Sequence, residues 1–148
     1  MAAKSTPFSG SLLKLILNGT PIASLAANAA TNAATVLHVS LHTDAPLLSG
    51  DPSNNEVAYT GYARVAVARD GTGWVVTGNS ASPAAQIAFG ERTDTGPVIT
   101  ATHMAVGVPN SIWMWSGRLL DSAGQPIDLL IQNGTVPIIR TTTKIMET

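Results

Sequence analysis

The stretch "TVLHVSLH", Thr35 to His42, decides the fold class. Leu37, Val39 and Leu41 alternate with polar residues, and this period of two is typical of a β-strand with one buried face. Similar apolar runs continue toward the C-terminus, separated by segments rich in glycine, proline and asparagine. The sequence therefore predicts a mainly β protein, and about eight antiparallel strands at this spacing indicate a jelly-roll-like β-sandwich.

Two turn signals predict specific hairpins in the later part of the chain. A tight turn at Asp70–Gly73 joins "VAYTGYARVAVAR" to "WVVTG". Asn133-Gly134, the strongest two-residue hairpin signal, joins the last two strands. Pro137 places the final strand at a sheet edge, because proline has no N–H to donate to a neighbouring strand. The other expected strands are "AAQIAF", "PVITATHMAVGV", "SIWMWSGRLL", "PIDLLIQ" and "TVPIIRTTT".

The N-terminal part predicts one short helix, over residues 10–19. Its leucines and isoleucine form an apolar stripe, Ser9 or Ser11 can cap its start, and Asn18-Gly19 supplies a left-handed stop. A chain of 148 residues is of single-domain size. We therefore expect one domain, 1–148, made of an N-terminal arm (1–9), the helix (10–19), an Ala-rich connector (20–34), the β-sandwich (35–143) and a C-terminal tail (144–148).

The charge content is the most informative feature of the composition. Charged residues make up 11% of the chain and the net charge is -1, whereas a typical soluble domain has about 25% charged residues. Such a surface is prone to association unless partners cover part of it. The basic residues are scattered from Lys4 to Lys144, whereas nucleic-acid binding needs clustered cations. We therefore expect protein partners and no nucleic acid.

The sequence also argues against a membrane span and against disulfides. No apolar stretch approaches the ~18 residues that a membrane span needs, and the first residues lack the apolar core of a signal peptide. There is no cysteine, which excludes disulfides and thiolate metal sites. We expect a soluble protein without a membrane partner.

The residues that could support catalysis or metal binding are poorly arranged for either. His38 and His42 lie four residues apart on a strand, hence roughly 13 Å apart, too far to bind one ion together. His103 alternates with alanines and is expected to lie on a packed face. Serines are abundant, but none lies in the nucleophile-elbow pattern G-x-S-x-G. We expect no catalytic residue, no cofactor, no metal and no enzymatic activity.

Tyr62 and Arg64 are candidates for a protein contact. If Tyr59 to Ala68 is extended, both side chains share one face with small alanines. Arginine presents a planar fork that suits carboxylates and carbonyls. Arg64 then either pairs with a nearby acid such as Glu56 or makes a charge-assisted contact with a neighbouring protein.

Trp113 and Trp115 in "IWMW" are also candidates for a protein contact. On an extended strand both tryptophans share one face, while Ile112 and Met114 share the other, so both faces are apolar. The strand is then either central in the core or in contact with another protein. A sugar-stacking platform is the less favoured alternative, because few polar residues lie nearby to fix sugar hydroxyls.

The two ends of the chain are candidates for arms that lie over a neighbouring subunit. Pro7 and Phe8 are the apolar anchors of the N-terminal arm, Met1 to Ser9. Thr141 to Thr148 is the corresponding segment at the C-terminus.

The order of these features resembles a family of small tailed-bacteriophage proteins. The resemblance is carried by "LLKLILNG", "VSLHT", "EVAYTGYARVAV", "IAFGE" and "THMAVG", and is sharpest at Gly61-Tyr62-Ala63-Arg64 and at Thr102-His103 followed by Ala105-Val106-Gly107. The family that the chain resembles consists of the jelly-roll cement, or decoration, proteins of the capsid, whose relatives are often labelled tail-fibre proteins.

The resemblance implies a non-enzymatic protein on the outer capsid surface of the virion, made in the host cytoplasm. It would join adjacent major capsid subunits against the pressure of packaged DNA, as a homo-oligomer, a dimer or a trimer, at each capsid site. A tail or tail-fibre component is the alternative, and a carbohydrate-binding jelly roll is less favoured.

Overall fold

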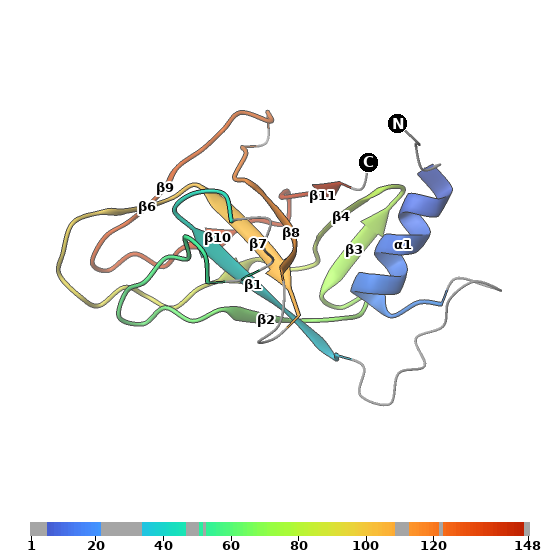
Figure 1. Cartoon of the computed structure of the whole chain (residues 1–148), viewed down its shortest axis with the longest axis horizontal. Helices are drawn as coiled ribbons and strands as arrows, with labels where there is room; N and C mark the ends of the chain where they lie inside the picture. Colours follow the sequence, from blue (N-terminus) through green and yellow to red (C-terminus); the bar gives the residue numbers. More distant parts are fainter. Residues whose placement is uncertain are drawn as a thin grey trace.

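The computed structural model describes residues 6–21, 34–46, 51, 53–108, 113–121 and 123–146, apart from the side chains of residues 6–8, 113 and 146 (Figure 1). The described residues form one helix and eleven short strands, paired in antiparallel sheets, so the predicted mainly β, sandwich-like fold is confirmed. The elements are α1 (Thr6–Asn18), β1 (Val36–His42), β2 (Val65–Ala68), β3 (Trp74–Thr77), β4 (Ser80–Pro83), β5 (Ile87–Ala88), β6 (Ile99–Ala101), β7 (His103–Gly107), β8 (Trp113–Arg118), β9 (Leu129–Ile131), β10 (Ile138–Ile139) and β11 (Ile145–Met146).

The largest sheet contains four strands in the order β2-β1-β7-β8. The remaining strands form three smaller sheets, β11-β4-β3, β10-β5 and β6-β9. Every pairing is antiparallel. The described part of the chain contains no helix with the length and hydrophobicity that crossing a membrane requires.

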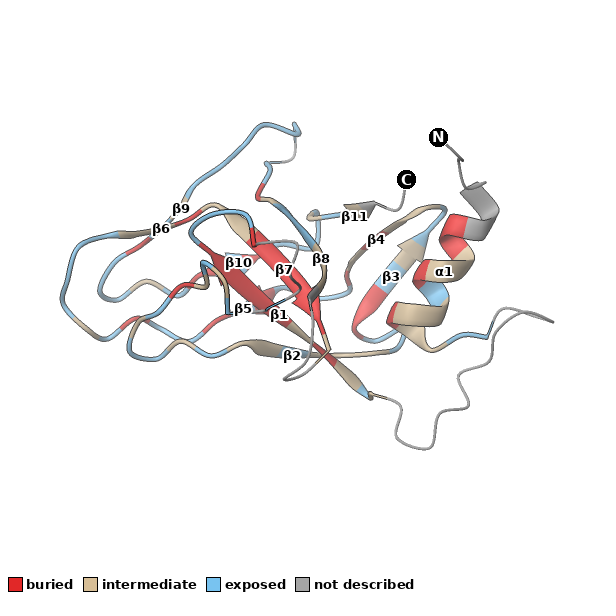
Figure 2. Ribbon diagram, in the orientation of Figure 1, coloured by how far each residue is buried: buried red, intermediate tan, exposed pale blue. Residues whose placement is uncertain are grey.

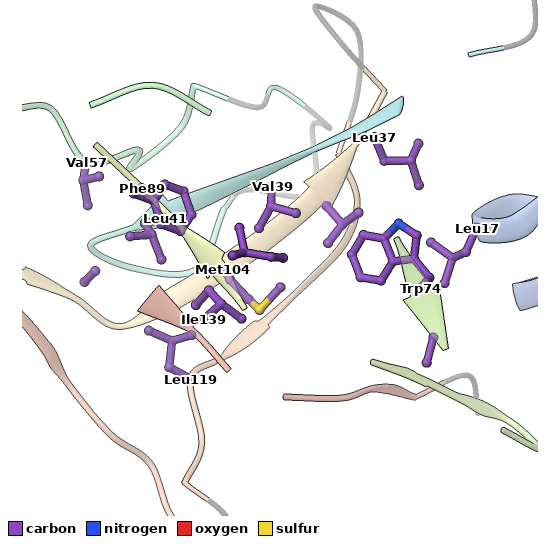
Figure 3. Close-up of a cluster of buried hydrophobic side chains, with 14 of the residues drawn as sticks. Leu17, Leu37, Val39, Leu41, Val57, Trp74, Phe89, Met104, Leu119 and Ile139 are labelled. Atoms are coloured by element: carbon purple, nitrogen blue, oxygen red, sulfur yellow. The ribbon is translucent and has the colours of Figure 1, made fainter. Parts of the chain in front are cut away.

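The hydrophobic core lies against one face of the four-stranded sheet. Leu37, Val39 and Leu41 of β1 are buried, as their alternation predicted, and Met104 and Val106 lie opposite them on β7. Figure 3 shows the labelled β1 side chains and Met104 packed with Trp74 and Ile139 of the smaller sheets and with Leu17 of α1. Figure 2 shows the most buried segments on β1, β7 and parts of α1 and β3. Burying each large aliphatic side chain contributes about 1.5–3 kcal/mol to stability.

Helix α1 begins earlier than the sequence predicted. It starts at Thr6 rather than at residue 10, because Pro7 fits the first turn of a helix, where its missing N–H is not needed. It ends at Asn18, where Gly19 with φ 65° supplies the predicted left-handed stop. Residues 6–9 are therefore helical, so the helix begins inside the segment that the sequence predicted to be an arm. Leu13 and Leu17 are fully buried and fix the helix to the core.

Helix α1 packs against the hairpin of β3 and β4 through a glycine. A Cβ atom added at Gly10 would lie 2.1 Å from the carbonyl oxygen of Gly78 in the hairpin turn, so only glycine fits there. At the other end of the helix, Arg69 donates to the carbonyls of Leu15 (2.8 Å) and Ile16. A guanidinium at this place satisfies carbonyls that a helix end leaves unpaired.

Both predicted turns exist, but neither joins the two strands of a hairpin. The amides of Gly73 and Trp74 donate to the Asp70 carbonyl (3.1 and 3.0 Å), yet β2 and β3 belong to different sheets. Gly134 has φ 79°, yet β9 pairs with β6 while β10 pairs with β5. Turn residues determine where the chain reverses, and here each reversal carries the chain from one sheet to another.

The long strand expected before the first turn is also much shorter than predicted. Only Val65–Ala68 is a strand, because Gly61 has φ 101° and the Tyr62 amide donates to the Tyr59 carbonyl (3.0 Å), which forms a turn. The prediction that Tyr59 to Ala68 is extended is therefore wrong for its first half.

The expected C-terminal tail is partly a strand. Ile145 and Met146 of β11 pair with Ala81 and Ser80 of β4, so the sheet extends beyond residue 143. Pro137 directly precedes β10, whose partner among the described strands is β5, and this agrees with the predicted edge position.

Candidate interaction surface

Glu56 organises a polar cluster beside the end of β1. The Arg64 guanidinium donates to both carboxylate oxygens of Glu56, at 2.8 Å from Nε and 2.6 Å from its second nitrogen. The Tyr62 hydroxyl donates to the same carboxylate at 2.9 Å. The two-pronged contact holds the pKa of Arg64 above its usual value. Arg64 is thus paired within the chain, with the acid that the sequence suggested.

Tyr62 connects this cluster to the core. Its hydroxyl accepts a hydrogen bond from the Leu41 amide of β1 at 3.1 Å. Its ring stacks on Phe89 with centroids 6.0 Å apart and meets Tyr59 edge-on at 5.3 Å. Burial raises the pKa of the Tyr62 hydroxyl well above its usual value. These contacts fix the irregular segment before β2 onto the sheet, and a role of Tyr62 or Arg64 in binding another protein stays a prediction.

Ser40 and His42 meet on the second face of β1, which the alternation predicted to be open but which is buried at both positions. Ser40 Oγ lies 2.8 Å from Nε2 of His42, whose Nδ1 lies 2.8 Å from the Asn54 carbonyl. Because a carbonyl only accepts, Nδ1 carries the proton and Nε2 accepts from Ser40. Burial lowers the pKa of His42, which keeps the ring neutral. Exposed fractions of 4% for Ser40 and 0% for His42 leave a substrate no access, so the pair is structural.

The histidines do not gather into a metal site. His42 lies opposite His103 of β7, whereas His38 lies opposite Gly107. The described residues contain no group of three or more His, Cys, Asp or Glu side chains that could hold an ion.

A groove between β8 and β11 is the best candidate for an interaction surface. Its volume is about 320 Å³. Met104, Val106 and Trp115 come from the four-stranded sheet, and Ile145 comes from β11, which lies next to β8 in Figure 1. Arg118 and Lys144 also line it.

The two strands that border the groove are both sheet edges. β8 ends the order β2-β1-β7-β8, and β11 ends the order β11-β4-β3, among the strands that the structure describes. An edge strand presents backbone N–H and C=O groups that can pair with another chain. The groove therefore combines apolar side chains with backbone groups suited to receive an extended segment.

Of the predicted contact residues whose side chains the structure describes, Tyr62, Arg64 and Trp115, one lines this groove. Trp115 is half-buried, packs against the core and lines the groove. The side chains of Trp113, Pro7 and Phe8 lie outside the described residues. The sequence predicted that Trp113 and Trp115 share one face of a regular strand. A register shift between Val106 and Gly107, opposite these residues, interrupts the alternation on which that prediction was based.

Lys144 and Ile145 were missed as groove residues, because the sequence placed them in a tail. Ile145 and Met146 are adjacent apolar residues, but two residues are too few to show the alternation that identifies a strand.

Most of the described cations are already bonded within the chain. Arg92 is buried and donates to the carboxylate of Asp94 and to the carbonyls of Pro97 and Ile131. Arg64, Arg69 and Arg118 also have partners in the same chain. Lys144 is exposed, and it forms no ion pair with a described carboxylate.

Comparison with families of known proteins gives a match over most of the chain. Residues 12–124, well over half of the chain, match the family described as podophage GP4 fiber I protein gp80. A search of curated proteins finds no match. The match extends from α1 through β8 and therefore covers the four-stranded sheet and most of the core. The protein is a structural component of a bacteriophage virion, and the chain belongs to the podophage GP4 fiber I protein gp80 family.

Proposed function

We propose that this protein is a capsid decoration protein. It binds the outside of the assembled phage head and joins adjacent major capsid subunits, without catalysing a reaction. Its partners are the major capsid protein and further copies of the same chain, as dimers or trimers. Family membership supports the virion role, and the sequence resemblance to cement proteins supports the placement on the head.

The groove between β8 and β11 is the observation that carries this proposal. A mostly apolar groove bordered by two edge strands is suited to hold a segment of another protein. The bonding of four arginines within the chain supports protein partners over nucleic acid, since a nucleic-acid surface needs clustered free cations.

A fibre subunit is the second candidate function, and the description of the matched family favours it. The same groove would then join copies or neighbours within a fibre. The two placements differ in stoichiometry, because a decorated shell repeats each contact by icosahedral symmetry and a fibre does not.

Copy number in purified virions tests the proposal. Gel densitometry against the major capsid protein should give on the order of hundreds of copies per virion for a decoration protein. A few copies per virion would favour the fibre subunit. Absence of the chain from purified virions would contradict both candidate functions.

A further inference from the structure

We propose that the groove between β8 and β11 receives an extended segment of a neighbouring virion protein, added as a strand along β8, with a carboxylate that pairs with Lys144. This inference rests on the proposed function, because it names the partner chemistry of the same groove. The partner segment is expected to be apolar on the side facing the groove and to carry an Asp or Glu near one end.

Backbone pairing is the first reason for an extended partner. β8 contains six residues, Trp113–Arg118, which is about 20 Å of strand. One edge of β8 pairs with β7, and no described strand pairs with the opposite, outer edge. A partner strand can therefore form backbone hydrogen bonds over most of this length, which is the usual basis of binding by strand addition.

The side chains of the groove give the second reason. Trp115, Leu120 and Ile145 line the groove together with Met104 and Val106 of β7. Leu120 is 47% exposed, although it is a large apolar residue. Covering these side chains removes apolar surface from water and favours an apolar occupant.

Charge gives the third reason, and it separates a peptide from a sugar. Lys144 lines the groove without an ion pair to any described carboxylate, whereas Arg118 already donates to Asp128 and to the Thr102 carbonyl. An acidic residue of the partner would complete the pairing of Lys144. Trp115 packs against the core, so its ring is less suited to serve as an open platform for a sugar.

Carbodiimide cross-linking of purified virions tests the carboxylate contact. The reagent joins a lysine amine to a carboxylate that contacts it, and mass spectrometry identifies both residues. We expect Lys144 to be joined to an Asp or Glu of a different virion protein. Lys14, exposed on the solvent side of α1, is the matched control and should not be joined to the same segment. A link from Lys144 to a second copy of the chain, or no link at all, would overturn the proposal.

Competition for virion incorporation tests the apolar contact. Leu120→Asp should lower incorporation about tenfold relative to wild type, which corresponds to about 1.4 kcal/mol. Val75→Asp is the matched control, because Val75 is 50% exposed and lies on β3, outside the groove. Both variants should keep the wild-type unfolding temperature within a few degrees, so that a folding defect is recognised.

The outcomes separate this inference from the proposed function. If the chain is abundant in virions while Leu120→Asp is incorporated as well as Val75→Asp, the groove proposal fails, and copy number alone then decides the decoration role. If Leu120→Asp is incorporated normally but virions adsorb poorly to host cells, the groove binds a host ligand instead. If the chain is absent from virions, the proposed function itself fails.

Discussion

Replacing Tyr62 with phenylalanine probes the connection between the Glu56 cluster and the core. The Tyr62 hydroxyl accepts from the Leu41 amide at 3.1 Å and donates to Glu56 at 2.9 Å. Tyr62→Phe keeps the ring and its stacking on Phe89, but removes both hydrogen bonds. The variant therefore isolates the polar contribution of one hydroxyl group.

The expected loss follows from the two bonds. An amide in a buried strand that loses its acceptor costs about 1–3 kcal/mol, and a hydrogen bond to a charged group contributes about 1.5–3 kcal/mol. Only part of the second contribution is lost, because Glu56 keeps both contacts with Arg64. The free energy of unfolding should fall by about 2–3 kcal/mol, or roughly 5–10 °C in melting temperature for a chain of this size.

Urea unfolding followed by circular dichroism measures this loss, with Tyr59→Phe as the matched control. The Tyr59 hydroxyl makes one hydrogen bond, to the Gly90 carbonyl at 2.9 Å, at an exposed position. Its removal should cost about 0.5–1.5 kcal/mol. Equal losses for the two variants, at unchanged dependence on urea concentration, would refute the role assigned to Tyr62.

Three further changes test other parts of the structure. Gly10→Ala should lower the free energy of unfolding by at least ~1 kcal/mol, because its Cβ meets the hairpin turn, although alanine normally stabilises a helix. Gly71→Ala has open space around it and should be nearly neutral, so the reverse ranking of the two variants in thermal unfolding would refute this packing. Burial lowers the pKa of His42 below its value in the unfolded chain, so the stability that the neutral ring contributes is present above about pH 6.5 and is lost as the pH falls. His42→Gln should therefore make the free energy of unfolding less dependent on pH, and an unchanged pH dependence would contradict this role. Arg64→Lys keeps the charge but loses the two-pronged contact with Glu56, and at this partly exposed position it should lower the free energy of unfolding in urea by about 1 kcal/mol. A variant as stable as wild type would show that the geometry of the guanidinium is unimportant.

The sequence predicted the buried faces of strands better than their pairing. Alternation at Leu37, Val39 and Leu41 identified β1 and its core face, because side chains on a strand must alternate. The turns at residues 70–73 and 133–134 were identified correctly as turns. Their hairpins were wrong because local backbone geometry does not determine which sheet receives the next strand.

The candidate groove was only partly predictable. The sequence identified Trp115 as a candidate, because a strand with two apolar faces needs both faces covered, by the core or by another protein. β11 contains only two residues, too few to show any alternation, so Ile145 gave no strand signal. The groove also depends on residues of two different sheets lining one hollow, and that arrangement arises from the whole fold rather than from any one segment.

Loss of packaged DNA on heating tests the decoration role most directly. A protein interface of standard size buries about 1,600 Å², and repeating such a contact over a shell opposes any expansion that separates neighbouring subunits. Heads that lack this protein should therefore assemble and package DNA, but release it at a lower temperature than wild-type heads. Adding back purified protein should restore the wild-type release temperature. Identical release curves for heads with and without the protein would contradict the decoration role and favour the fibre placement.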